Sequence, residues 1–190
     1  MQLLPRSSVS NEFVMVLETA RLTLRHFQPS DAKALQAILG DIEVMRFSAT
    51  GAMSPDQICA WIDRQLAGYD RYGYSLNAVI ENHTKELIGG CGLLVWEDLD
   101  GQREDEIGYR FAQEWWGQGF ATEAASATRD FGFGQLGRDR LISIIQPANL
   151  RSIRVAERVG MQPKRDTVFK ELDVRIYAIE RSQWQKLSLI

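Results

Sequence analysis

Two closely spaced glycines before an alanine-rich stretch form the most distinctive chemical signal in this chain. The segment W-G-Q-G-F-A-T-E-A occupies residues 116–124, after a strand-like segment and at the start of a helical one. Glycines let backbone N–H groups converge on a ligand, and a helix N-terminus favours an anion by about 0.3–1 kcal/mol, or about 2 kcal/mol where partly buried. The spacing therefore predicts an anion-binding turn suited to a diphosphate. The alternative is a glycine turn that only starts a helix.

Two better-known phosphate loops fit this segment less well. A P-loop needs a Lys-Ser/Thr pair after its last glycine, and the chain has no such pair there. The dinucleotide-binding motif needs Gly or Ala three residues after its second glycine, where this chain has Thr122. The P-loop is excluded, and binding of another phosphorylated nucleotide stays an alternative.

Length and composition predict one globular domain without a global attraction to nucleic acid. The chain has 190 residues, of which 45% are hydrophobic and 25% charged, and a net charge of −3. Residues 1–16 hold only a short apolar stretch, too brief for a signal sequence or a membrane span. We interpret them as a loose N-terminal leader before a single domain at residues 17–190, and we expect no membrane partner.

The cysteines and histidines do not form a metal motif or a disulfide framework. Cys59 and Cys91 lie far apart without C-x-x-C spacing, and His26 and His83 are not spaced like metal ligands. We therefore expect no metal and a reducing, cytoplasmic location.

Hydrophobic periodicity predicts the elements that position the turn. Before the turn we expect a strand at residues 21–27, a helix from Ser30 or Asp31 to Gly40, a helix from Ser54 to Gly68, and strands at 74–81, 86–96 and 106–112, with a polar loop at 97–105. After it we expect a helix from Gly119 to about Gly132, a strand at 141–145, a helix at 149–160 capped by Asn149 with Leu150, Ile153, Ala156 and Val159 buried, and two strands within 163–180. Gly108, inside a strand, predicts a bulge or the close approach of another chain or ligand.

Three motifs and this order of elements resemble one known family. The motifs are E-I-G-Y at residues 106–109, the glycine segment at 116–124, and N-L-R-S-I-R-V-A-E-R-V-G-M at 149–161. They resemble the GNAT superfamily of N-acetyltransferases. Together with L-E-T-A-R-L-T-L-R at residues 17–25, they resemble its branch of ribosomal-protein N-terminal (alanine) acetyltransferases. The resemblance implies an α+β fold with three αβα layers around a central mixed, mostly antiparallel, strongly twisted sheet.

The resemblance also implies a site for acetyl-CoA as cosubstrate. In the family the diphosphate rests on backbone N–H groups of the glycine turn, and the pantetheine arm lies along the preceding strand. The implied cofactor-binding residues here are Arg110, Phe111 and Ala112, then Gly117, Gln118, Gly119, Phe120, Ala121 and Thr122, and finally Asn149, Ser152 and Arg154. Trp116 stands where the family usually has Gln or Arg, which removes one side chain from the motif.

A base is needed because an amine attacks a thioester only when it is neutral. Glu106 is the candidate, since it shares a strand face with Gly108 and its position in the family adjoins the thioester. A chain of waters is the alternative, and Glu123 is a rival whose place in the first helical turn a structural role explains. Glu104 and Asp105 are expected to be exposed acids at the strand end.

The leaving thiolate needs a proton, and the usual donor of the family is missing. That tyrosine lies seven residues after the Asn, where this chain has Ala156. Ser152 or a water is therefore expected to serve, and the resemblance places Asn149 and Ser152 beside the thioester. Cys91 has no paired His and is expected to be a buried, inert thiol.

The sequence does not identify the acceptor amine. An α-amino group titrates near about 8 and lysine near about 10.4, so preparing a lysine amine costs about 3 kcal/mol more. A modest base therefore favours a peptide or protein N-terminus. Small amines such as amino acids, polyamines or antibiotics stay alternatives, as does a non-catalytic acyl-CoA-binding module. We expect a monomer or a homodimer.

Overall fold

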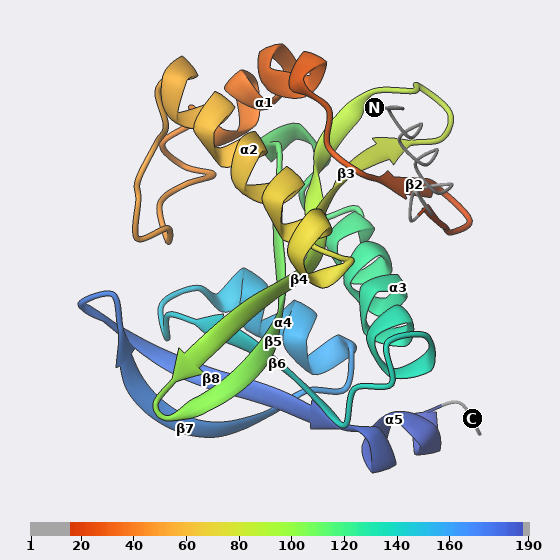
Figure 1. Ribbon diagram of the computed structural model, residues 1–190, viewed down its shortest axis with the longest axis vertical. Helices are drawn as coiled ribbons and strands as arrows, with labels where there is room; N and C mark the ends of the chain where they lie inside the picture. Colours follow the sequence, from red (N-terminus) through yellow and green to blue (C-terminus); the bar gives the residue numbers. More distant parts are fainter. Residues whose placement is uncertain (1–15, 188–190) are drawn as a thin grey trace, which may run out of the picture.

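The structure is a computed structural model that describes residues 16–187 (Figure 1). In chain order the strands are β1 (Leu17–Glu18), β2 (Leu22–Arg25), β3 (Leu76–Glu81), β4 (Leu87–Leu99), β5 (Gln102–Phe111), β6 (Arg140–Ile145), β7 (Gln162–Phe169) and β8 (Leu172–Glu180). The helices are α1 (Ala32–Leu39), α2 (Pro55–Tyr72), α3 (Phe120–Gly134), α4 (Leu150–Arg158) and α5 (Arg181–Leu187), with short 3-10 turns at Pro29–Asp31 and Gln113–Trp115. The leader predicted for residues 1–16 lies outside the described residues except for Val16.

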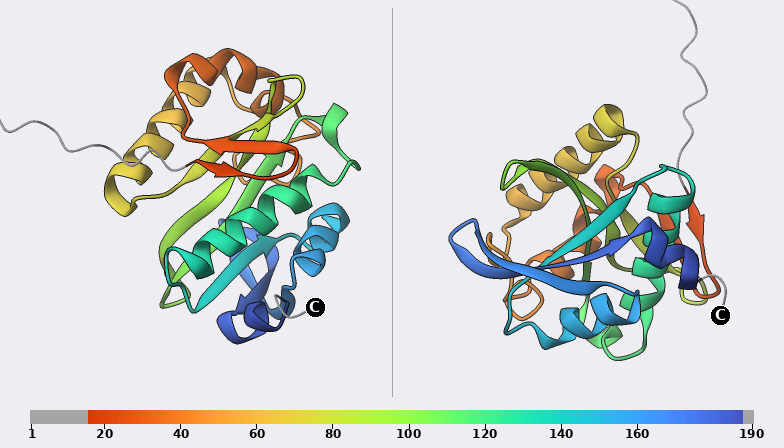
Figure 2. Two further views of the ribbon diagram at one scale, coloured as in Figure 1. Left: turned by 90° about the vertical axis from the view of Figure 1, so that its right-hand side faces the viewer. Right: turned by 90° about the horizontal axis from the view of Figure 1, so that it is seen from below.

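One twisted sheet forms the middle layer of the molecule. Its strand order is β1-β2-β3-β4-β5-β6-β8-β7, and all neighbours run antiparallel except β5 and β6. Seen from below, the sheet lies between α2 on one side and α4 on the other (Figure 2). The predicted α+β fold, with three layers around a mixed and mostly antiparallel sheet, is confirmed.

Two large hydrophobic cores lie on the two faces of the sheet, and a small third cluster of Leu99, Ile142, Ile176 and Ala178 packs beside Trp96, Ile144 and Phe169. The larger core joins the inner face of α3 to β4, β5 and β6 through residues such as Ala124, Phe131, Leu93, Ile107 and Leu141. The other joins α1 and α2 to the sheet through residues such as Leu35, Ile58, Ile62, Leu76 and Ala78. Successive side chains of a strand alternate between faces, so β5 sends Ile107, Tyr109 and Phe111 toward α3 and Glu106, Gly108 and Arg110 toward α1 and α2.

The two parallel strands β5 and β6 separate shortly after they meet. They share one register pair, Glu106 with Ile142, although both strands continue beyond it. Side chains bridge the strands at this point: Ser143 Oγ donates to the Ile107 carbonyl at 3.0 Å, and Ile144 N donates to Glu106 Oε1 at 3.4 Å. The gap beyond this pair leaves the edge of β5 next to a space between α3 and α4.

The polar loop predicted for residues 97–105 is wrong. β4 and β5 instead run through this region as one long hairpin that turns at Asp100 and Gly101, which have φ values of 54° and 84°. Asp-Gly is a favoured pair for a two-residue hairpin turn because both residues tolerate positive φ. The acidic residues of segment 97–105 favoured the prediction of a loop over that of a hairpin turn.

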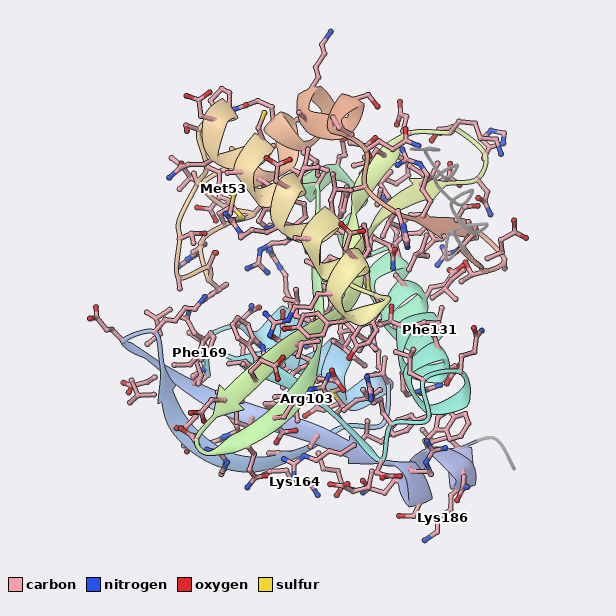
Figure 3. All side chains as sticks on the ribbon, in the orientation of Figure 1. Met53, Arg103, Phe131, Lys164, Phe169 and Lys186 are labelled. Atoms are coloured by element: carbon pink, nitrogen blue, oxygen red, sulfur yellow. The ribbon has the colours of Figure 1, made fainter. Side chains whose placement is uncertain are left out.

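Glu104 and Asp105 are buried rather than exposed, which corrects the prediction for them. They are 5% and 4% exposed. Arg140 lies 3.4 Å from Glu104, while Arg138 and Arg103, the latter labelled in Figure 3, lie 2.8 and 3.3 Å from Asp105. Arg140 begins β6 and Arg138 lies just before it, so two of the three pairs depend on the neighbouring strand, whereas Arg103 belongs to β5 itself.

Six further features differ from prediction. α2 continues past Gly68 to Gly73, whose φ of 80° suits a glycine at a helix end. β4 and β5 stay in register across Gly108, so no bulge occurs there, and a Cβ at Gly108 would lie 3.3 Å from Leu94. The Asp31 carboxylate does not cap α1; it accepts from Gln28 N at 2.8 Å, at the start of the 3-10 turn, and pairs with Arg25 at 2.8 Å. Leu150 is 59% exposed, and β1 and α5 were not predicted.

Candidate active site

A cavity of about 600 Å³ opens where β5, the glycine turn and α4 meet. Its lining comes from four segments: the α1–α2 connection (Glu43, Val44, Arg46, Phe47), the end of β5 (Tyr109, Arg110, Phe111), the turn and start of α3 (Trp115, Trp116, Gly117, Gly119, Phe120, Ala121, Thr122), and α4 with the two residues before it (Ala148, Asn149, Leu150, Arg151, Ser152, Arg154, Val155, Arg158). The cavity therefore reaches both faces of the sheet through the gap beside β5.

The glycine turn presents backbone N–H groups without protein acceptors. Gly117 and Gly119 have φ values of 77° and 87°, which residues with a Cβ rarely adopt. Gly119 caps α3 without a side-chain hydrogen bond, and the first helical bond runs from Glu123 N to the Gly119 carbonyl. Within the described chain, the N–H groups of Phe120, Ala121 and Thr122 thus have no acceptor, which makes this helix end an anion site.

Residues before β2 hold the turn in place. Arg21 donates to the Gln118 carbonyl at 3.0 Å, and its guanidinium lies 4.3 Å above the Phe120 ring. The Glu123 carboxylate accepts from Thr19 Oγ1 at 2.6 Å and from Arg21 N at 2.9 Å, and it pairs with the Arg21 guanidinium at 2.7 Å. Burial alone would raise the pKa of Glu123, but these hydrogen bonds outweigh it and lower the pKa. Glu123 is therefore occupied in bracing the turn, which counts against its use as a base.

Trp116 closes one side of the turn. Its Nε1 donates to the Phe111 carbonyl at 2.8 Å, which ties the turn to the end of β5. The Arg151 guanidinium lies 4.2 Å from the centre of the Trp116 ring. The residue that departs from the family pattern thus positions an arginine of α4 over the cavity.

α4 begins at the cavity, and the predicted cap is confirmed. The Asn149 side chain accepts from Ser152 N at 3.2 Å. Tyr109 comes from β5 toward the same turn, and its hydroxyl lies 3.5 Å from the Ser152 carbonyl oxygen. Burial raises the pKa of Tyr109 to about 12. The hydroxyls of Ser152 and Tyr109 therefore both line the cavity, although no tyrosine occupies the position of Ala156.

Glu106 lies in the sheet beside the cavity and does not line it. Its carboxylate accepts from Trp96 Nε1 at 2.7 Å and from Ile144 N at 3.4 Å. The Trp96 ring packs edge-on against Phe169, labelled in Figure 3, with 4.9 Å between centroids. Burial raises the pKa of Glu106, and the hydrogen bond from Trp96 opposes this rise. A carboxyl group that titrates above its usual range is suited to proton transfer near neutral pH.

The structure brings most of the predicted site residues to the cavity. All of them line it except Glu106, Ala112 and Gln118; the Gln118 side chain instead donates to the Glu114 carbonyl at 2.8 Å. The roles assigned to these residues stay predictions. Sequence reasoning did not include Tyr109, Trp116, Arg151 or the lining of the α1–α2 connection. Tyr109 stands in the E-I-G-Y motif, but its approach to α4 follows from the fold.

Cys91 is buried next to Thr128, with Sγ 3.4 Å from Oγ1, and burial raises the pKa of its thiol to about 12. This matches the expected inert thiol. Among residues 16–187 no group of three or more His, Cys, Asp or Glu side chains is placed to hold a metal ion. None of the described helices combines the length and apolar character needed to span a membrane.

Several known proteins resemble this chain. YkkB of Bacillus subtilis, an uncharacterised protein, is 36% identical over 146 residues, which cover 76% of this chain and 84% of YkkB. The uncharacterised N-acetyltransferase YnaD of the same organism is 29% identical over 90% of this chain and 99% of YnaD.

Solved structures show the same fold. An acetyltransferase from Agrobacterium tumefaciens superposes with a TM-score of 0.77 at 25% identity, covering 93% of this chain and 99% of that one. RimL, a ribosomal L7/L12 α-N-protein acetyltransferase solved with coenzyme A, gives a TM-score of 0.66 at 16% identity, covering 87% of this chain and 98% of RimL. The family model of the acetyltransferase (GNAT) domain matches residues 21–162. This chain is an acetyltransferase that belongs to the GNAT family.

Proposed function

We propose that this enzyme transfers the acetyl group of acetyl-CoA to a primary amine, within a ternary complex and without a covalent enzyme intermediate. The observation that carries the proposal is the row of unpaired N–H groups at the start of α3, in the same cavity as the open edge of β5. A diphosphate at that helix end and an extended arm along β5 match the shape of coenzyme A. RimL, which shares the fold, was solved with that molecule.

The residues present fit the cosubstrate in charge and in space. A Cβ built at Gly117 meets no atom within 4 Å, so the turn leaves room for a ligand beside the backbone. Arg151, Arg154 and Arg158 line the α4 side of the cavity, where they would neutralise phosphate charge. The main-chain groups of Arg110, Phe111 and Ala112 would bind the pantetheine arm as an added strand.

Bound acetyl-CoA would supply the activated acyl group, and side chains of the protein would accept and donate the protons. Glu106 accepts the proton of the attacking ammonium through a water, because its carboxylate lies beside the cavity and not in it. Asn149 fixes the first turn of α4, which places the Ser152 and Tyr109 hydroxyls in the cavity. Either hydroxyl can donate a proton to the leaving sulfur, and the thiol pKa of about 8.5 makes a strong acid unnecessary.

The acceptor class that we propose first is the α-amino group of a peptide or protein N-terminus. It loses its proton at a pH about 2 units lower than lysine does, so a single carboxylate is a sufficient base. The resemblance to the ribosomal-protein branch supports the same choice. A small-molecule amine is the alternative.

Release of free thiol during incubation with acetyl-CoA tests the proposal. The acceptor panel contains peptides that begin with Ala, Ser and Met, together with amino acids, polyamines and aminoglycosides. We expect turnover with at least one primary amine and none with its N-acetylated form. Binding of acetyl-CoA without turnover of any acceptor would favour a binding module, and thermal stabilisation by ATP or NAD but not by acetyl-CoA would contradict the proposed cosubstrate.

A further inference from the structure

Arg110 brings a positive charge into the cavity on the side away from α3 and α4. It follows Gly108 on the β5 face that meets the α1 and α2 core, since a Cβ at Gly108 would lie 3.5 Å from Leu76 of that core. Val44 and Phe47 of the α1–α2 connection line the same cavity, and Val44 packs against the α1 and α2 core. The guanidinium therefore lies on the acceptor side of the gap and apart from the anion site at α3.

The Arg110 guanidinium has few hydrogen-bond partners among residues 16–187. Within that range its one hydrogen bond goes from NH1 to the Tyr109 carbonyl at 3.1 Å, although a guanidinium carries five N–H donors. Among the described residues, no carboxylate lies within 4 Å of it; the nearby Glu106 attracts it but is bonded to Trp96 and Ile144. Burial lowers the pKa of Arg110, as expected for a cation that has lost water without gaining an ion pair.

The charges that line the whole cavity also favour an anionic ligand. Five arginines line it, namely Arg46, Arg110, Arg151, Arg154 and Arg158, against one acid, Glu43, which is exposed and lies 3.8 Å from Arg46. The phosphates of the cosubstrate would account for the three arginines of α4. This assignment leaves Arg110, on the opposite side of β5, without an anion.

We propose that Arg110 binds a carboxylate of the acceptor, so that the preferred substrates are primary amines that also carry an acid group. This inference rests on the proposed acetyl transfer and specifies its acceptor. Arg110 takes no part in the bond changes: the amine nitrogen forms a bond to the acyl carbon, the carbon–sulfur bond breaks, and the amine proton leaves through Glu106. The second proton lost by the nitrogen restores the one that Ser152 or Tyr109 gives to the leaving sulfur. The guanidinium holds the acid group while the amine faces the thioester.

Two kinds of acceptor share this chemistry. One is a free amino acid, which carries amine and carboxylate in one small molecule. The other is a peptide N-terminus with Asp or Glu as its second residue. Matched pairs separate them: glycine and β-alanine against their amides, and C-terminally amidated Ala-Asp-Ala-Ala against Ala-Asn-Ala-Ala.

The first measurement uses the wild-type enzyme and compares kcat/KM within each pair at equal concentrations of neutral amine. We expect the acid member of at least one pair to be preferred by about 10- to 100-fold, which is the range for one charge-assisted hydrogen-bond pair. The pair that shows the preference identifies the kind of acceptor. Equal kcat/KM values within all three pairs would overturn the inference.

The second measurement assigns the preference to Arg110. In Arg110→Met the acid-to-amide ratio falls toward one, while Arg110→Lys keeps part of it because the charge remains. Arg71→Met, which removes an exposed arginine of α2 paired with Glu97, is the matched control and keeps the wild-type ratio. A ratio in Arg110→Met equal to that of the wild type, in a variant with wild-type thermal stability, would contradict the assignment.

Two further measurements distinguish a failure of this inference from a failure of the proposed acetyl transfer. Calorimetric binding of each pair to the protein saturated with coenzyme A shows the acid preference even if no acceptor turns over, in which case acetyl transfer fails and carboxylate binding stands. Succinyl-CoA tests the donor: faster transfer than with acetyl-CoA, lost in Arg110→Met, would place the carboxylate on the acyl group and overturn the inference.

Discussion

Trp96 of β4 lies diagonally across from Glu106 of β5, whose register partner is Leu94, and the indole Nε1 donates to the Glu106 carboxylate at 2.7 Å. Ile144 N of β6 donates to the other oxygen of the same carboxylate at 3.4 Å. One side chain thus connects three strands at the place where β5 and β6 separate. The proposed base is held by the same geometry that opens the site.

Replacement of Glu106 by Gln is expected to lower kcat by about 100- to 10,000-fold, the range for loss of a general base. Because burial raises the pKa of Glu106, the wild-type rate is expected to rise with pH until that raised pKa is passed. A pH–rate profile checks this. The acid limb disappears in Glu106→Gln, whereas a purely structural role would lower the rate equally at every pH.

The raised pKa of Glu106 also affects stability. The native carboxyl group keeps its proton to higher pH than the unfolded one, so its contribution to the free energy of unfolding is largest below its ordinary pKa. That contribution is lost as pH rises through the raised value. Urea unfolding of wild type and Glu106→Gln across this window is expected to show the loss in the wild type alone.

Trp96→Phe is expected to shift the acid limb of the pH–rate profile to higher pH. The indole hydrogen bond stabilises the charged form of Glu106, so its removal raises the pKa of Glu106 further. The rate near neutral pH then falls severalfold, while the maximum at higher pH changes little. Trp61→Phe, in the core between α2 and Phe27, serves as the control; an unshifted limb in Trp96→Phe would show that this bond does not tune the base.

Gly119→Ala is expected to raise the KM for acetyl-CoA by about 5- to 30-fold, because about 1–2 kcal/mol of backbone strain falls on the N–H groups that bind the diphosphate. Gly119→Val is expected to raise it further, since its branched side chain fills the same space. Gly101→Ala is a matched control, because Gly101 has a φ of 84° against 87° for Gly119 but lies in the β4–β5 turn. Steady-state kinetics distinguish the two sites: equal KM values in both alanine variants would mean that strain alone, and not the ligand, explains the glycine.

Glu123→Ala is expected to cost about 1–2 kcal/mol of unfolding free energy through the lost bonds to Thr19 and Arg21, after allowance for their partial exposure. Since the pKa of Glu123 is lowered in the fold, this contribution is present above its ordinary pKa and is lost as pH falls through the lowered value. Chemical unfolding at neutral and acid pH measures it. At saturating acetyl-CoA, kcat is expected to stay within about threefold of the wild type, a much smaller change than removal of a general base causes. A larger loss of kcat would indicate that Glu123 is the base.

The parts of the site that the sequence predicted are those with local causes. The glycine turn depends on two positive φ angles, and the cap of α4 on one Asn side chain, so both are visible in a few adjacent residues. The burial of Glu104 and Asp105 could not be predicted, because Arg140 and Arg138, which pair with them, lie more than thirty positions away along the chain, and only Arg103 is local. The turn at Asp100 and Gly101 was within reach of the sequence, since Asp-Gly is a known hairpin signal.

The surroundings of Tyr109 and Arg110 on the acceptor side of the cavity could not be predicted from the sequence, for a similar reason. Alternation along β5 predicts that Tyr109 and Arg110 point to opposite faces. It does not predict that one meets α4 at Ser152 and that the other lines a cavity together with the α1–α2 connection. Those contacts require the separation of β5 and β6, which follows from pairing across the whole sheet.

The position of the diphosphate in a crystal structure with coenzyme A tests the central claim most directly. We expect its oxygens within hydrogen-bond distance of the N–H groups of residues 118–122, and the sulfur in the gap between β5 and β6. A diphosphate bound elsewhere, with these N–H groups left to solvent, would contradict the proposed site and the catalytic roles built on it.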